Sequence, residues 1–122
     1  GIKVTDEESL KHIVNEFFEF GVKNVLITLG SKGYFAGLPN VMEYVPSFKV
    51  NAIDTTGAGD VFSGSLAAFL AEGISLEKAA RMSNAAASIS VTRIGAQNAA
   101  PKGSEVQEFI SSYKVAESEI VN

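Results

Sequence analysis

The residues of this chain best suited to chemistry lie close together in the stretch DTTGAGDVFSG, residues 54–64. It contains two glycines with one residue between them, Gly57 and Gly59, and a glycine lets the backbone approach a ligand closely or adopt a positive φ. Set immediately before a helix, the N–H groups of Gly57, Ala58 and Gly59 would point outward, and the helix dipole would make them a site for an anion. Asp60 would then stand at the start of that helix, where a carboxylate is stabilised in its ionised form.

An anion site beside a carboxylate suits phosphoryl transfer to an alcohol. Backbone amides stabilise negative charge on the transferred group, and the carboxylate accepts the proton of the attacking hydroxyl. A purely structural interpretation competes with this one, in which Asp60 is a favourable first-turn acid and the glycines serve a tight turn. Two other phosphate motifs fit poorly. The dinucleotide fingerprint requires its third glycine earlier than Gly64, and a P-loop requires a lysine where Ser65 stands.

Composition limits the classes of protein that this chain can belong to. Its 122 residues, 46% of them hydrophobic, are enough for one domain with a core. The net charge of −4 argues against nucleic acid and against an anionic membrane surface as partners. The absence of cysteine excludes disulfides and thiolate metal sites, and the single histidine excludes a histidine-based metal cluster. The apolar runs are shorter than the roughly 18 residues of a membrane span, so we expect a soluble, cytoplasmic protein.

An amphipathic helix is predicted near the beginning of the chain. Thr5 and Glu8 have the spacing of a capping box, and Gly21 is placed to end the helix. Its apolar stripe, with helical spacing, comprises Leu10, Ile13, Val14, Phe17 and Phe18.

Strands are predicted in the next part of the chain. The apolar, β-branched run VLITL, residues 25–29, is typical of a strand buried on both faces of a sheet. Residues 34–37 and 41–50 read as shorter strands of a meander, and Pro46 places the last one at an edge or a bulge. A buried parallel strand needs neighbours on both sides, and only one such run is present. We therefore expect further strands upstream of Gly1.

Three further helices complete the pattern. The first covers residues 61–73, with Phe62 and Phe69 in the core, and the second, capped by Ser75, covers residues 76–91. After a loop at residues 93–103, a second capping-box pattern at Ser104 and Gln107 predicts a helix over residues 105–113. One helix, then strands, then three helices indicate an α/β fold with few strands and about four helices.

The stretch at residues 54–64 resembles the C-terminal signature of the ribokinase-like (PfkB) family of carbohydrate kinases. Two more segments resemble that family in the expected order. TLGSKG, residues 28–33, is similar to its nucleotide-binding turn after a central strand, and SNAAASISVTRIGAQNAAP, residues 83–101, to the segment along its adenine and monovalent-cation sites. The part SVTRIGAQ is most similar to the ribokinase subgroup. The resemblance implies a three-layer αβα fold, with residues 1–122 as its C-terminal nucleotide-binding and catalytic portion.

The resemblance also implies a role for individual residues. Asp60 would be the catalytic base that contacts the sugar hydroxyl, and Gly57, Ala58 and Gly59 would form the anion hole. The nucleotide would contact Thr28, Leu29, Gly30, Ser31, Lys32, Gly33, Gly59 and Asn84. A potassium-type cation would be held by Asp54, Thr56, Ser90, Arg93, Gly95 and Ala99. At position 99 the chain departs from the family, where a serine is frequent, because Ala99 has no hydroxyl to offer the cation.

Several of these residues also have an ordinary structural interpretation. Asn84 could be a polar residue at a packing face of an alanine-rich helix, and Lys32 could be a solvated charge in a turn. Arg93 could matter only through its carbonyl group. These alternatives remain open at the level of sequence.

The resemblance implies ATP, Mg²⁺ and a monovalent cation as cofactors, and a sugar as the substrate. It also implies that the full-length parent is a homodimer. Members of the family are longer than this chain, and their N-terminal part supplies most sugar contacts and a small β lid. One alternative is that the chain is a catalytically silent fragment, or a nucleotide-binding module without a sugar site. Others are a kinase for fructose, ketodeoxygluconate or a nucleoside, or for a vitamin-like alcohol.

Overall fold

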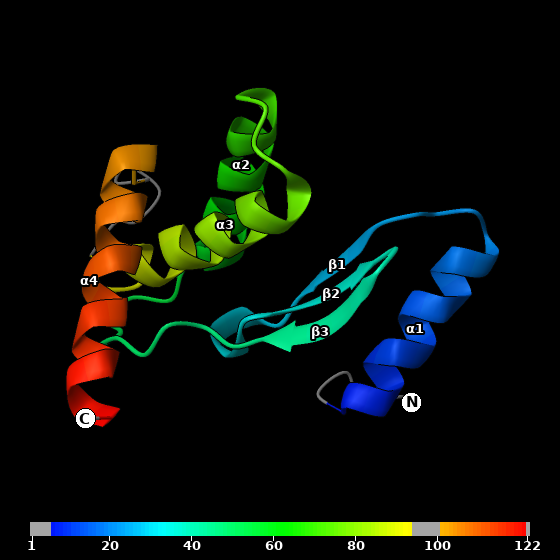
Figure 1. Cartoon of the computed structure of the whole chain (residues 1–122), viewed down its shortest axis with the longest axis horizontal. Coiled ribbons are helices and arrows are strands. Elements are labelled where there is room, and N and C mark those ends of the chain that lie inside the picture. The colour runs from blue at the N-terminus through cyan, green and yellow to red at the C-terminus, as the bar shows by residue number, and fades with distance from the viewer. Residues whose placement is uncertain (1–5, 94–100, 122) are drawn as a thin grey trace. The chain divides into compact units, whose positions relative to one another are not determined.

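The computed structural model describes residues 6–93 and 101–121, although not the side chains of Ser31 and of residues 115–121. The chain divides into two units, Gly1–Ser47 and Phe48–Asn122, which are described separately below. Figure 1 shows the elements of both units. The described residues form four helices and one three-stranded sheet. The α/β fold class predicted from the sequence is therefore confirmed, and so is the number of helices.

The first unit consists of helix α1 (Glu7–Glu19) and strands β1 (Val25–Thr28), β2 (Tyr34–Leu38) and β3 (Val41–Val45). The strands form an antiparallel sheet in the order β1-β2-β3, which is the predicted meander. β3 is an edge strand and ends one residue before Pro46, as expected of a residue that cannot donate to a ladder.

The two ends of α1 follow ordinary capping chemistry. Its N-cap is Asp6, whose carboxylate accepts a hydrogen bond from the amide of Glu8 at 3.2 Å, so the predicted cap at Thr5 is wrong by one residue. Thr5 itself lies outside the described residues. Gly21 has φ 93° and follows the C-cap, which confirms it as the residue that ends the helix.

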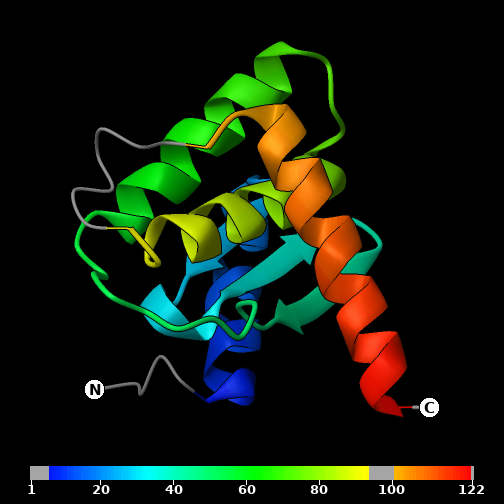
Figure 2. The ribbon, with the colours of Figure 1, turned by 90° about the vertical axis from the view of Figure 1, so that its left-hand side faces the viewer.

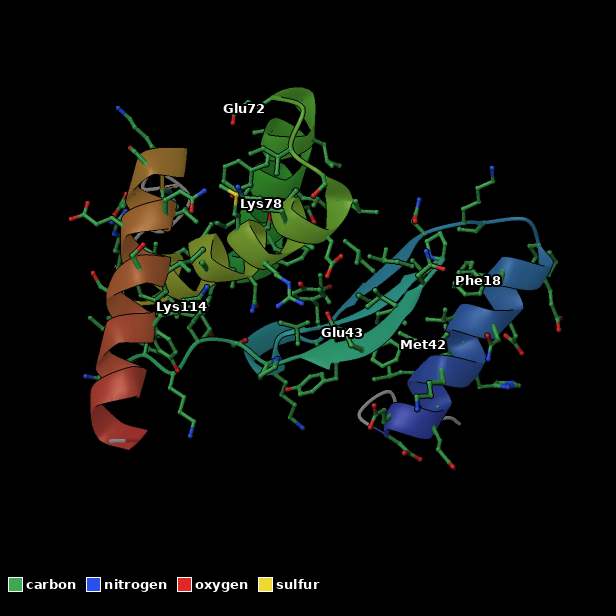
Figure 3. The ribbon with its side chains drawn as sticks, viewed as in Figure 1. Phe18, Met42, Glu43, Glu72, Lys78 and Lys114 are labelled. Atoms are coloured by element: carbon green, nitrogen blue, oxygen red, sulfur yellow. The ribbon has the colours of Figure 1, made fainter. Side chains whose placement is uncertain are left out.

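The core of the first unit lies between α1 and the sheet. Leu10, Val14 and Phe35 are buried at its centre, and Phe18 and Met42 pack against them from the two sides (Figure 3). The remaining apolar residues around this centre are Val25, Ile27 and Leu29. The predicted stripe was wrong at one position. Phe17 remains 46% exposed because it lies a third of a turn away from Phe18 on the helix.

β1 differs from its prediction. Its residues are half-buried or exposed, and within the described residues it pairs only with β2, in antiparallel orientation. The buried strand is instead β2, which lies between the other two. Val25 and Ile27 of β1 pack against the core of this unit. The described part of the chain covers only one edge of the strand.

The second unit is helical, with α2 (Ala58–Ala71), α3 (Leu76–Ser90) and α4 (Gly103–Val121). α3 packs against both other helices, as Figure 2 shows for α3 and α4. Phe69 and Val106 are among the buried residues of their core, and the ring of Phe48 contacts that of Phe109 at 5.3 Å between centroids.

Helix boundaries in this unit confirm some predictions and correct others. Ser75 is the N-cap of α3, and its hydroxyl accepts from the amide of Lys78 at 3.4 Å. α4 begins at Gly103, so Ser104 lies inside the helix and is not its cap, and the helix continues past the predicted end to Val121. No helix in the described residues is long and apolar enough to cross a membrane.

Candidate functional site

The beginning of α2 contains the residues predicted to bind an anion. Gly57 is the N-cap of the helix, with φ 80° and ψ 5°, a left-handed conformation that glycine adopts readily. Helical geometry starts at Ala58, three residues earlier than predicted, so Gly59 and Asp60 already belong to the first turn. The amide of Val61 closes this turn by donating to the carbonyl of Gly57 at 2.9 Å.

The first-turn amides have few acceptors. The amide of Ala58 donates to the carbonyl of Thr55 over a long 3.3 Å. Those of Gly57, Gly59 and Asp60 donate to no acceptor in the described residues. Such N–H groups at a helix N-terminus carry partial positive charge and bind anions.

Space remains open beside these amides. Gly59 is exposed, and a Cβ atom added to it would meet nothing within 4 Å. Asp60 is also exposed, and its carboxylate makes no hydrogen bond or ion pair with the described residues. Within this unit, the amides and the carboxylate are therefore accessible from solvent.

The loop before α2 is tied to the end of α3. One carboxylate oxygen of Asp54 accepts from the amide of Thr56 at 2.9 Å, which forms a local turn. The amides of Ile53 and Asp54 both donate to the carbonyl of Val91, at 2.6 and 3.0 Å. This shared carbonyl places Asp54 next to the last turn of α3.

Two further predicted cation ligands lie at that end of α3. The carbonyl of Ser90 accepts from the amide of Arg93 at 3.1 Å, and the guanidinium of Arg93 pairs with the carboxylate of Glu105 on α4. Carbonyl groups at a helix C-terminus carry partial negative charge, and hard cations take oxygen ligands. The other two predicted ligands, Gly95 and Ala99, lie outside the described residues.

The predicted nucleotide turn, residues 28–33, belongs to the first unit and joins β1 to β2. It contains the 3₁₀ turn η1 (Gly30–Lys32), and the amide of Leu29 donates to the carbonyl of Gly33 at 2.8 Å. Thr28, Gly30 and Lys32 are exposed, whereas Gly33 is buried. A Cβ on Gly33, where φ is 104°, would lie 2.1 Å from the carbonyl oxygen of Val45.

Asn84, the residue predicted near the adenine, lies on α3 and is 4% exposed. Its carbonyl accepts from the hydroxyl of Ser88 at 3.0 Å. Buried polar side chains are normally hydrogen-bonded, so both a packing role and a binding role remain compatible with this position.

Three groups that hold these segments in place were not predicted. They are the carbonyl of Val91, the carboxylate of Glu105 and the hydroxyl of Tyr44, which donates to the carbonyl of Lys32. A backbone carbonyl has no signal in a sequence. The two side chains come from elements distant in the chain, so only the fold reveals their contacts.

A comparison with known protein families identifies the chain. Residues 1–103 match the model of the pfkB family of carbohydrate kinases. The chain belongs to this family. Among curated proteins, the ribokinase of Haemophilus influenzae is 42% identical over 110 residues, which cover 90% of this chain and 36% of that protein. The resemblance inferred from the three motifs is thus confirmed.

Solved structures of the family have the same fold. The Arabidopsis thaliana ribokinase complexed with ribose and ATP is 33% identical, with a TM-score of 0.75, and the match covers 86% of this chain and 34% of the other. A candidate ribokinase II from E. coli in complex with ATP and Mg²⁺ is 31% identical, with a TM-score of 0.76 and coverages of 84% and 33%. The chain spans about a third of the length of these relatives.

Proposed function

We propose that the protein containing this chain transfers a phosphoryl group from ATP to a sugar hydroxyl, and that this chain supplies the catalytic base and the anion hole. The first turn of α2 carries the proposal. It presents amides without acceptors in the described residues beside an exposed carboxylate, Asp60. Membership of a carbohydrate kinase family supports the same chemistry.

Asp60 is the proposed general base. Its carboxylate accepts the proton of the attacking hydroxyl, and a positioned base contributes roughly 10²–10⁴-fold to rate. The amides of Gly57 and Gly59 stabilise the negative charge that develops on the transferred group. The amide of Ala58, whose bond to Thr55 is long, joins them at little cost when an anion is present.

The proposed nucleotide-binding residues are those of the turn at residues 28–33 and Asn84. The relatives solved with ATP, and one of them with Mg²⁺, support the same cofactors for this protein. Within the described residues no three acidic or histidine side chains gather into a metal cluster. In nucleotide sites, Mg²⁺ is usually held by one or two carboxylates and the nucleotide phosphates. When bound, it neutralises phosphate charge.

A monovalent cation is proposed at the junction of the loop and α3. Asp54 and Thr56 would hold it with the carbonyls of Ser90 and Arg93, and Gly95 and Ala99 would complete the set. The hydrogen bonds from the amides of Ile53 and Asp54 to Val91 support this grouping, since they place the backbone of Asp54 at the C-terminal end of α3. Such a cation would order the loop that leads into the anion hole.

The test of the proposed base uses the complete gene product that contains this chain. We expect Asp60→Asn to lower kcat for ribose by at least about 100-fold, because the hydroxyl loses its proton acceptor. Glu77→Gln is the matched control, since Glu77 is also an exposed acid in the first turn of a helix, α3. Equal activity of Asp60→Asn and the control would refute the role of Asp60.

A second function is favoured by length, because the chain covers only about a third of its relatives. On its own it would be a nucleotide-binding module without a sugar site. Calorimetry with the 122-residue chain then detects ATP binding, while the chain transfers no phosphate to ribose, fructose or a nucleoside. Measurable phosphorylation of any of these would refute the module. The same acceptors, offered to the complete gene product, identify its substrate, and the proposed homodimer is tested by its mass in solution.

A further inference from the structure

The turn at residues 28–33 is closed by one short backbone hydrogen bond, from the amide of Leu29 to the carbonyl of Gly33 at 2.8 Å, and its 3₁₀ part is held by two longer ones. The amide of Lys32 donates to the carbonyl of Leu29 at 3.1 Å, and the amide of Gly33 reaches the carbonyl of Gly30 at 3.4 Å. Hydrogen bonds of a 3₁₀ turn have poorer geometry than those of an α-helix, so such a turn is readily remodelled. Contacts from outside the turn therefore add to the support of its 3₁₀ part, Gly30–Lys32.

β3 supplies those contacts from the same unit. The hydroxyl of Tyr44 donates to the carbonyl of Lys32, an acceptor for which no other donor is found in the described residues. At the end of the same strand, the backbone of Val45, Pro46 and Ser47 packs tightly on Gly33. One side chain of β3 and the backbone at its end and just beyond it thus contact two consecutive residues of the turn.

Tyr44 fixes the peptide group that follows the Cα of Lys32. Because a peptide is planar, holding its carbonyl also restricts the backbone on either side, and with it the direction of the lysine side chain. Lys32 is exposed, so its ammonium is available to a ligand. The contact is at the surface, since Tyr44 is itself 41% exposed.

From these contacts we propose that Tyr44 is a positioning residue for the nucleotide, because its bond to the Lys32 carbonyl holds the turn in the conformation that binds ATP. This rests on the proposed function, in which residues 28–33 contact the nucleotide. Tyr44 itself touches no phosphate and takes no part in proton transfer. It acts through Lys32.

The experiment compares two tyrosine-to-phenylalanine variants of the complete gene product. Tyr44→Phe removes the hydroxyl that supports the turn. Tyr113→Phe is the matched control, because the hydroxyl of Tyr113, on α4, also bonds a backbone group, the amide of Lys49 at 3.3 Å. For Tyr44→Phe we expect the Kd for ATP, measured by calorimetry, and the KM for ATP to rise roughly three- to tenfold. The sugar KM and kcat stay within about twofold of wild type, and Tyr113→Phe changes none of the four.

The outcomes separate this inference from the proposed function. If the wild type binds ATP and Tyr44→Phe binds it equally well, Tyr44 is not a positioning residue and the proposed function stands. If the sugar KM or kcat changes as much as the KM for ATP, the effect is a general loss of structure and the inference is overturned. If Asp60→Asn keeps full activity while Tyr44→Phe still weakens ATP binding, the proposed base fails and the role of Tyr44 survives. Absence of ATP binding by the wild type refutes both.

Discussion

Two glycines of this chain, Gly33 in the turn between β1 and β2 and Gly59 in the first turn of α2, have different surroundings. At Gly33, φ is 104° and an added Cβ would lie 2.1 Å from the Val45 carbonyl, so the fold itself requires a residue without a side chain. At Gly59, the backbone is helical and an added Cβ would meet nothing within 4 Å. The difference teaches that only one of the two glycines is explained by the described structure. The proposed anion at the start of α2 would explain the other.

The largest effect is expected at Gly33. Gly33→Ala places a methyl group inside the van der Waals radius of backbone atoms and demands a positive φ, so we expect it to lower the free energy of unfolding by about 3 kcal/mol or more. Urea denaturation of the 122-residue chain measures this. Gly30→Ala is the control in the same turn, because Gly30 also has a positive φ, 60°, but open space around it. A loss no greater than the control's would contradict the steric explanation.

A smaller effect is expected at Gly57, where the strain is in the backbone conformation. Gly57→Ala must hold an alanine at φ 80°, which costs about 1–2 kcal/mol of stability. Gly57→Asn should cost less, because asparagine visits the left-handed region more readily. Equal losses for the two variants would show that φ is not the cause.

Gly59→Ala should have the opposite sign. A helical glycine in open space is a poorer helix former than alanine, so the substitution should raise the stability of the chain by about 0.5–1 kcal/mol. Gly64→Ala, at another exposed glycine of α2 with open space, provides the reference for this gain. In the complete gene product Gly59→Ala should nevertheless reduce kcat. If Gly59→Ala were more stable and equally active, Gly59 would not be needed for a ligand, and the proposed contrast with Gly33 would be wrong.

The smallest effect is expected for the ion pair between α3 and α4. The side chains of Arg93 and Glu105 are 35% and 41% exposed, and pairs of this kind contribute about 0.2–1 kcal/mol. Glu105→Gln should lower stability by that amount, and the loss should shrink when salt is raised. Glu77→Gln breaks the more exposed pair with Arg81 and provides the control. A large loss would show that Glu105 holds more than an exposed pair.

The sequence predicted the positions of the helices and strands better than it predicted which of them are buried. Periodicity located α1, and residue types located the meander and the cap at Ser75, because these depend on neighbours in the chain. The burial of β1 was not predictable, since an apolar strand does not specify what covers it. The start of α2 at Ala58 was missed because a left-handed glycine cap leaves no polar side chain to recognise.

The residue types of the candidate site could be read from the sequence, but the contacts that hold its segments in place could not. A glycine pair before an acid indicated an anion site, and the described geometry is compatible with it at Gly57 and Asp60. The contact of the Tyr44 hydroxyl with the Lys32 carbonyl was not predictable, because it depends on how β3 lies against the preceding turn.

The carbonyl of Val91 has a thermodynamic consequence. Because it accepts amides from both Ile53 and Asp54, the loop before α2 cannot shift without disturbing the last turn of α3. An ion that binds at the end of α3 and prefers one loop conformation would change the affinity of the first turn of α2 for an anion. By linkage, the anion would change the affinity for the ion by the same factor, so titrating either one reports on the other.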